Sequence, residues 1–151
     1  MDTAEQVIFM DNVLTGNAVH TIDAKGRIVV PSKFRDALGT NVFAFRSTDG
    51  CIRVYPELHF LRMLDKLCKG DVHKTALRRK ISGRTEQLKI DSQGRLLVPE
   101  AMRLAVGITD KVYMVGMVEW LELWEEKSLT EMEEQLSDEE AEEMMAELGM
   151  A

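Results

Sequence analysis

Hydrophobic and polar residues follow the same order of patterns twice along this chain. Each time, two short stretches with the period-two alternation of a strand flank a tight turn, and a short helical segment and two more apolar strands follow. The strands before the turns are predicted at 18–22 and 86–90, the strands after them at 27–30 and 95–98, and the helices at 32–38 and 100–106. Each unit therefore has the order strand, strand, short helix, strand, strand.

The turn between the first two strands has the form Asp-x-x-Gly in both units. Gly26 and Gly94 stand where a tight turn most needs a positive φ, which glycine adopts without steric cost. Asp23 and Asp91 can accept a hydrogen bond from the backbone two residues further along. The pattern predicts a rigid hairpin tip in each unit.

The two units are copies of each other. An offset of 68 residues aligns 22–39 with 90–107, and 9 of the 18 aligned positions are identical. Chance does not produce such a match, so we interpret the chain as a duplication of a unit of about 50 residues.

Two helices are predicted between the copies. Residues 56–70 have the spacing of an amphipathic helix, and residues 71–83 predict a second helix that ends at Gly83. The apolar face predicted for the first of them consists of Leu58, Leu61, Leu64 and Cys68.

The segment after the second copy predicts further helices. Ser128 with Glu131, and Ser137 with Glu140, have the spacing of capping boxes. The weak apolar stripes of these helices consist of Leu129, Met132, Leu136, Met144 and Leu148.

Four short strands and one short helix bury little apolar surface alone, so each unit needs the other. The simplest fold is an α+β fold, mainly β with helices, in which two hairpin units share one pseudo-symmetric β core. The central helical hairpin would pack outside this core, and acidic helices would follow at the C-terminal end. The apolar faces left over favour assembly into a homo-oligomer.

The net charge of −7 is unevenly distributed. Residues 16–116 hold 18 Lys and Arg against 10 Asp and Glu, whereas residues 117–151 hold 13 acidic residues and one lysine. A basic body with an acidic tail is one indication of a nucleic-acid partner, although a solvated surface produces the same asymmetry.

Other classes of function lack support in the sequence. The chain has no signal-peptide pattern and no run of apolar residues long enough for a membrane span, so we expect a cytoplasmic protein without a membrane partner. Cys51 and Cys68 are interpreted as buried thiols, and His20, His59 and His73 follow no ligand spacing. Without a nucleophile beside a base or a glycine-rich phosphate loop, we expect no enzyme activity, cofactor or metal.

The repeated turn is a candidate binding loop. Its tip exposes Lys25, and Arg27 projects from the start of a strand, where a supported guanidinium can make bidentate contacts to guanine or phosphate. Asp23 would then accept hydrogen bonds from the turn and orient Arg27. An alternative remains open, in which Asp23 with Arg27, and Asp91 with Arg95, are ion pairs that only stabilise the turns.

The two copies differ in charge, so if one face meets DNA, we expect it to be that of the first copy. The first copy carries Lys25, Arg27, Lys33 and Arg35 against Asp23 and Asp36. The second copy carries Arg95 and Arg103 against Asp91 and Glu100, so it is neutral and is expected to be mainly scaffold.

The duplicated motif D-x-x-G-R-[ILV]-x-[ILV]-P-x-x-[FM]-R, with CIRVYP after the first copy and VEWLELW after the second, resembles the MraZ family of bacterial transcriptional regulators. A single copy resembles the wider AbrB-like (SpoVT-AbrB) group of swapped-hairpin DNA-binding domains. The resemblance covers residues 16–124, and about a dozen additional residues precede it.

The resemblance implies a tandem AbrB-like fold that assembles into a ring-shaped homo-oligomer in the cytoplasm, associated with the nucleoid. It implies binding to double-stranded DNA at tandem short repeats upstream of the division and cell wall gene cluster, including the protein's own gene. The implied DNA-binding residues are Asp23, Lys25, Arg27, Lys33 and Arg35, with Asp91, Arg95 and Arg103 as the motif of the second copy. An oligomeric scaffold and an RNA-binding AbrB-like module without operator specificity are the alternatives.

The expected domain organisation follows from the copies and the charge. It comprises an N-terminal extension at 1–15, a first AbrB-like repeat at 16–58, a helical connector at 59–84, a second AbrB-like repeat at 85–126 and an acidic helical tail at 127–151.

Overall fold

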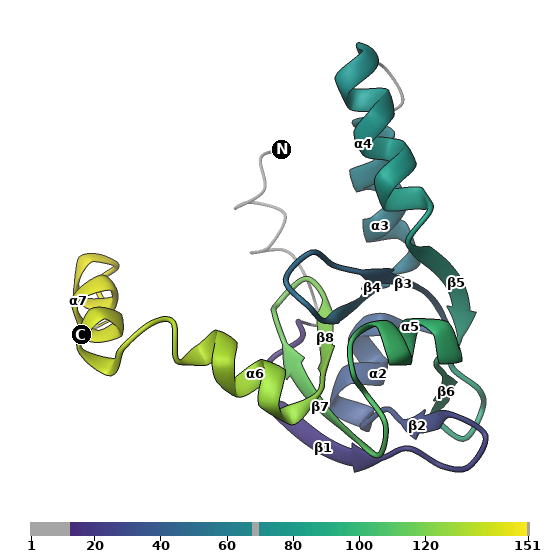
Figure 1. The fold of residues 1–151 in the computed structure, drawn as a ribbon, viewed down its shortest axis with the longest axis horizontal. Coiled ribbons are helices and arrows are strands. Elements are labelled where there is room, and N and C mark those ends of the chain that lie inside the picture. The colour runs from purple at the N-terminus through teal and green to yellow at the C-terminus, as the bar shows by residue number, and fades with distance from the viewer. Residues whose placement is uncertain (1–12, 68–69, 151) are drawn as a thin grey trace.

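The computed structural model of the protein describes residues 13–67 and 70–150. Its elements follow the predicted order twice, with two helices between the repeats and two after them (Figure 1). The first repeat comprises β1 Asn17–Thr21, β2 Arg27–Val29, α2 Ser32–Leu38, β3 Asn41–Arg46 and β4 Ile52–Pro56. The second repeat comprises β5 Thr85–Lys89, β6 Arg95–Leu97, α5 Glu100–Ala105, β7 Lys111–Gly116 and β8 Leu121–Trp124. The connector helices are α3 Glu57–Asp65 and α4 Val72–Ser82, and the tail helices are α6 Glu126–Glu133 and α7 Asp138–Glu147.

The two repeats interleave in one antiparallel sheet with the strand order β1-β7-β8-β4-β3-β5. Each repeat supplies an edge strand to the other: β1 pairs with β7, with Thr21 opposite Lys111, and β5 pairs with β3, with Asn41 opposite Lys89. Strands β4 and β8 join the two halves in the middle of the sheet. Because neither repeat completes this sheet alone, the predicted α+β fold with two repeats sharing one core is confirmed.

A second, two-stranded antiparallel ribbon pairs β2 of the first repeat with β6 of the second. Its centre is the pair Ile28 and Leu96. Reciprocal hydrogen bonds extend the ribbon beyond its strands: the Val30 N–H donates to the Gly94 carbonyl at 2.8 Å, and the Val98 N–H donates to the Gly26 carbonyl at 3.1 Å. The strand after each turn thus bonds to the turn of the other repeat, which is the local two-fold symmetry of the duplication.

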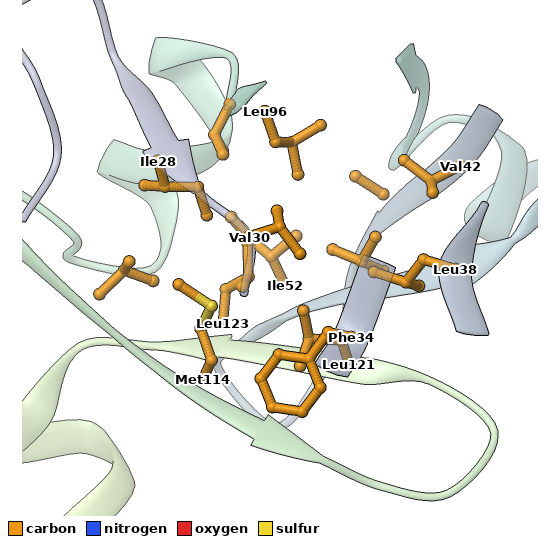
Figure 2. Close-up of a cluster of buried hydrophobic side chains, with 14 of the residues drawn as sticks. Ile28, Val30, Phe34, Leu38, Val42, Ile52, Leu96, Met114, Leu121 and Leu123 are labelled. Carbon is orange, nitrogen blue, oxygen red and sulfur yellow. The ribbon is translucent and has the colours of Figure 1, made fainter. Parts of the chain in front are cut away.

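The hydrophobic core joins the ribbon, the sheet and the short helices. Ile28 and Leu96 from the ribbon, Phe34 from α2 and Leu121 from β8 are all at most 1% exposed (Figure 2). Burying one such side chain stabilises the fold by about 1.5 to 3 kcal/mol. The inward face of the ribbon is therefore held firmly, and its outward face is presented on a rigid base.

Most local predictions are confirmed to within a residue or two. The turn glycines Gly26 and Gly94 have φ values of 84° and 78°. The capping box at Ser137 and Glu140 is present, with both reciprocal hydrogen bonds. Gly83 ends α4, as predicted.

The capping box predicted at Ser128 is wrong. Glu125 caps α6 instead, because its carboxylate accepts hydrogen bonds from the backbone N–H groups of Lys127 at 2.8 Å and Ser128 at 2.9 Å. Glu125 directly follows β8, so the helix begins at Glu126 and Ser128 lies within its first turn.

The apolar face predicted for α3 is also wrong. Leu58 and Leu61 are 64% and 45% exposed, and the buried residue of α3 is Phe60. The Phe60 ring stacks on Phe43 with centroids 4.8 Å apart and meets Tyr55 at 5.3 Å, so aromatic contacts with β3 and β4 determine the rotation of the helix. Cys68, the last residue of the predicted face, lies outside the described residues.

The helical connector projects from the core rather than covering it (Figure 1). All the residues of α4 from Val72 to Lys80 are exposed. Among the described residues, no helix is both long enough and apolar enough to cross a membrane.

Candidate nucleic-acid interface

The turn of the first repeat is organised around the carboxylate of Asp23. Its Oδ1 accepts hydrogen bonds from the backbone N–H groups of Lys25 and Arg27, both at 2.9 Å, and its Oδ2 accepts one from the Arg27 Nε at 2.7 Å. The backbone hydrogen bond from Arg27 is the main reason that the pKa of Asp23 lies below its usual value, since it stabilises the charged form. The carboxylate is therefore ionised at neutral pH and holds the arginine.

The turn of the second repeat has the same geometry. Asp91 accepts hydrogen bonds at 2.9 Å from the backbone N–H groups of Gln93 and Arg95, and the Arg95 Nε donates to its other oxygen at 3.0 Å. The backbone N–H of Arg95 is again the main cause of the lowered pKa of the carboxyl group. The ion pair exists in both copies, so each turn holds its arginine in the same way.

Both arginines lie on the outward face of the ribbon. Residues alternate across a strand, so Ile28 and Leu96 point into the core while the residues on either side of them point outward. In the register, Arg27 lies opposite Leu97 and Arg95 lies opposite Val29, which separates the two arginines by about 7 Å along the ribbon at ~3.3 Å per residue. The structure thus brings the two motifs onto one surface.

The exposed face of the ribbon also carries two aliphatic side chains, which the sequence analysis missed. Val29 and Leu97 are 44% and 54% exposed. The period-two pattern could have found them, because positions 27 and 29 share one face of a strand and position 28 the other. The outward face consists of Arg27, Val29, Arg95 and Leu97, and we call it the ribbon face.

Arg35 and Arg103 do not join the ribbon face but cross to the turn of the opposite repeat. A Cβ at Gly94 would lie 2.5 Å from Nη1 of Arg35, and one at Gly26 would lie 2.8 Å from Nη2 of Arg103. Arg103 also donates from its Nε to the Val98 carbonyl at 3.1 Å. Each of these helix arginines therefore lies against the turn that holds the other copy's Asp–Arg pair.

Lys25 and Lys33 have different positions. Lys25 is exposed at the tip of the first turn, next to Arg27. Lys33 donates from Nζ to the Asn17 carbonyl at 2.8 Å, at the far end of β1 from Asp23. Lys33 is thus bonded to the start of β1, whereas Lys25 lies beside Arg27 of the ribbon face.

The ribbon face has the dimensions of a groove-binding element. The major groove of B-DNA is wide enough to admit a two-stranded β-ribbon, whose strands lie about 4.8 Å apart. The contact with Asp23 uses only the Nε–H of Arg27, so the terminal nitrogens of the guanidinium can still donate in pairs to guanine or to a phosphate. The aliphatic side chains beside the arginines suit contact with thymine methyl groups.

A buried polar cluster lies away from this face, and sequence analysis did not identify it. The ligand atoms of Asp49, Cys51 and Glu122 lie within 4.8 Å of one another. Hydrogen bonds occupy both carboxylates: Asp49 accepts from Arg53 at 3.3 Å, and Glu122 accepts from two tryptophan indoles at 3.1 and 2.9 Å. Burial raises the pKa of the Cys51 thiol to about 12, so the thiolate that a metal would need is disfavoured. The cluster connects β4 to β8.

These features define a class: a small tandem-repeat protein that presents an arginine-bearing ribbon on an intertwined β core. Residues 13–80 and 81–148 each match the family described as "MraZ protein, putative antitoxin-like". The chain is 38% identical over 112 residues to the transcriptional regulator MraZ of Lachnoclostridium phytofermentans, covering 72% of this chain and 79% of the relative. It is 35% identical over 144 residues to the transcriptional regulator MraZ of Caldicellulosiruptor bescii, covering 91% of this chain and all of the relative. The chain belongs to the MraZ family of transcriptional regulators, which are not enzymes, and carries two MraZ units in tandem.

Proposed function

We propose that this protein is a sequence-specific DNA-binding regulator that recognises tandem short repeats upstream of the division and cell wall gene cluster, its own gene included. It acts as a ring-shaped homo-oligomer of tandem AbrB-like, swapped-hairpin subunits, in the cytoplasm and associated with the nucleoid. The ribbon face is the observation that carries the proposal, because it presents Arg27 and Arg95 on one rigid, groove-sized surface.

The site residues have separate roles in this proposal. Arg27 and Arg95 contact the DNA, with Lys25 adding a phosphate contact beside the first of them. Asp23 and Asp91 orient the two arginines through the ion pairs of 2.7 and 3.0 Å. Arg35 and Arg103 support the turns, and Lys33, in α2, bonds to the Asn17 carbonyl at the start of β1.

Self-assembly supplies the affinity that one ribbon lacks. A three-residue ribbon spans only a few base pairs and binds weakly alone. Neighbouring subunits of a ring present the same ribbon at a fixed spacing, so tandem boxes engage several ribbons together, and linked binding of this kind raises affinity by about 10²- to 10⁴-fold.

A titration of labelled duplexes tests the proposal. The duplexes carry zero, one, two or three boxes from upstream of the protein's own gene, and each is titrated at two salt concentrations. We expect the affinity to rise steeply with the number of boxes and to fall with salt, because lysine and arginine contacts to phosphate release counterions. A matched control in which the boxes are scrambled keeps length and composition constant.

Two other outcomes would contradict the proposal. Equal, weak binding to all duplexes would support an oligomeric scaffold. Tighter binding to a single-stranded or duplex RNA of the same sequence would support an RNA-binding module, since phosphate contacts alone do not distinguish the sugar.

A further inference from the structure

The connector helix α4 is an exposed basic helix. Residues Val72–Ser82 contain four lysines and arginines and no acidic residue. The basic residues are Lys74, Arg78, Arg79 and Lys80. Arg78 and Arg79 line a shallow groove on the helix together with Thr75 and Ser82. This charge is a second basic surface, separate from the ribbon face.

Helix α4 also exposes apolar side chains. Val72 is 82% exposed and Leu77 is 48% exposed, and the helix buries no residue within the described part of the chain. An isolated helix shorter than about 12 to 15 residues is marginal in water, and most helical stability in proteins comes from packing. A surface that is both acidic and partly apolar would therefore complement this exposed helix.

The tail helix α7 has that surface. It contains six acidic residues and no basic residue, and it too buries no residue within the described part of the chain. Its apolar residues follow the spacing of one helix face, at Ala141, Met144, Met145 and Leu148. Met144 and Leu148 are 54% and 75% exposed. Glu142 and Glu147 border this stripe on opposite sides.

The two helices cannot meet within one chain as the structure has it. In Figure 1, α4 projects from the top of the core, while α7 lies beyond α6 at the far left. The ribbon formed by β2 and β6 lies below the core in the same view, away from both helices. Only a second copy can bring an α7 onto α4 in this arrangement.

We propose that α7 of one copy docks on α4 of the next copy. The helices have similar lengths, 10 and 11 residues, opposite charge and exposed apolar side chains. Apolar contacts supply the attraction, and the charges set the partner and orientation, because like-charged pairing of two α4 or two α7 helices is repulsive. This inference rests on the self-assembly part of the proposed function and makes the acidic tail the element that joins the copies.

Charge reversal of the full-length protein tests this docking in the absence of DNA. The first variant is Arg78→Glu with Arg79→Glu, and the second is Glu142→Lys with Glu147→Lys. Native mass spectrometry and sedimentation over a concentration series measure the mass relative to the 17.1 kDa monomer. We expect each variant to raise the concentration needed for assembly by about tenfold or more.

An equimolar mixture of the two variants provides the decisive measurement. In the mixture, the reversed α4 of one variant meets the reversed α7 of the other, so we expect assembly to return. The control matched to the first variant, Lys89→Glu with Lys111→Glu, makes the same charge change on exposed strand residues and should assemble like the unmodified protein. Circular dichroism checks that the helix content of each variant is unchanged, and Arg78→Gln with Arg79→Gln replaces the first variant if helix content is lost.

Two results would overturn the docking. One is assembly unchanged in both variants, and the other is assembly lost in both and not restored by mixing. Weaker binding of the first variant to a single-box duplex, with its mass unchanged, would instead assign α4 to DNA. A mass effect without any change in single-box binding supports the docking even if the operator is not the one proposed.

Discussion

Replacing Gly26 by alanine tests whether the turn of the first repeat depends on the second repeat. Gly26 has a φ of +84°, where an L-residue is strained by about 1 to 2 kcal/mol. The new Cβ would lie 2.8 Å from Nη2 and 3.2 Å from Cζ of Arg103, so the guanidinium must move. This movement disturbs the 3.1 Å hydrogen bond from the Arg103 Nε to the Val98 carbonyl.

The magnitude follows from these two effects. A hydrogen bond from a charged group contributes about 1.5 to 3 kcal/mol, and part of it is kept because the end of the arginine side chain is flexible. We therefore expect Gly26→Ala to lower the free energy of unfolding by about 2 to 4 kcal/mol. Gly50→Ala is the matched control, because Gly50 has a φ of +97° but no atom within 4 Å of its Cβ position, and it should cost only the backbone strain.

Urea unfolding, followed by the fluorescence of Trp120 and Trp124 at a fixed protein concentration, measures both changes. The same substitutions are then made in an Arg103→Ala background. There, Gly26→Ala should cost no more than Gly50→Ala, since the clashing side chain is gone. An equal cost of Gly26→Ala in both backgrounds would refute the contact between Arg103 and this turn.

Three further predictions concern the turns and the core. Arg27→Ala should reduce operator affinity about tenfold or more. Arg95→Ala should reduce it less, because Lys25 has no basic counterpart in the second turn. Fluorescence anisotropy measures both affinities, and equal losses would refute the larger role of Arg27. Asp23→Asn should be less stable than the unmodified protein at neutral pH. Because the folded pKa of Asp23 is lowered, this difference is present above its unfolded pKa and should vanish as the pH falls through the folded pKa in urea titrations. In a Cys68→Ser variant, a thiol reagent at pH 8 should modify Cys51 only on unfolding, since burial raises its pKa to about 12; rapid labelling of the folded protein would contradict this.

Local sequence patterns predicted most of the secondary structure. The two turns form as predicted, because each aspartate accepts a hydrogen bond from the backbone two residues on and each glycine adopts a positive φ. The predicted helix at 32–38 coincides with α2. The errors arose where long-range contacts compete with local signals. The contacts of Phe60 rotate α3 so that Phe60, and not the leucine stripe, faces the sheet. Glu125, and not Ser128, caps α6.

The site was predicted only in part. Each Asp–Arg ion pair follows from residues four apart in one turn, so the sequence alone predicted both. The charge difference between the copies suggested one binding copy and one scaffold copy, but the ribbon presents Arg27 and Arg95 together. Arg35 and Arg103 share the motif with these residues, yet they lie against the turns of the opposite repeats.

By itself, the sequence determined the duplication, the turns, the order of elements and the acidic tail, because each depends on residues close together in the chain. Only the tertiary structure decided that β2 pairs with β6, that β1 and β5 complete the sheet of the other repeat, and which side chains share the ribbon face. The physical reason is that two nearly identical units can pair within or between repeats with the same local patterns. The choice between these pairings depends on which one buries Ile28, Leu96 and Phe34 in a single core.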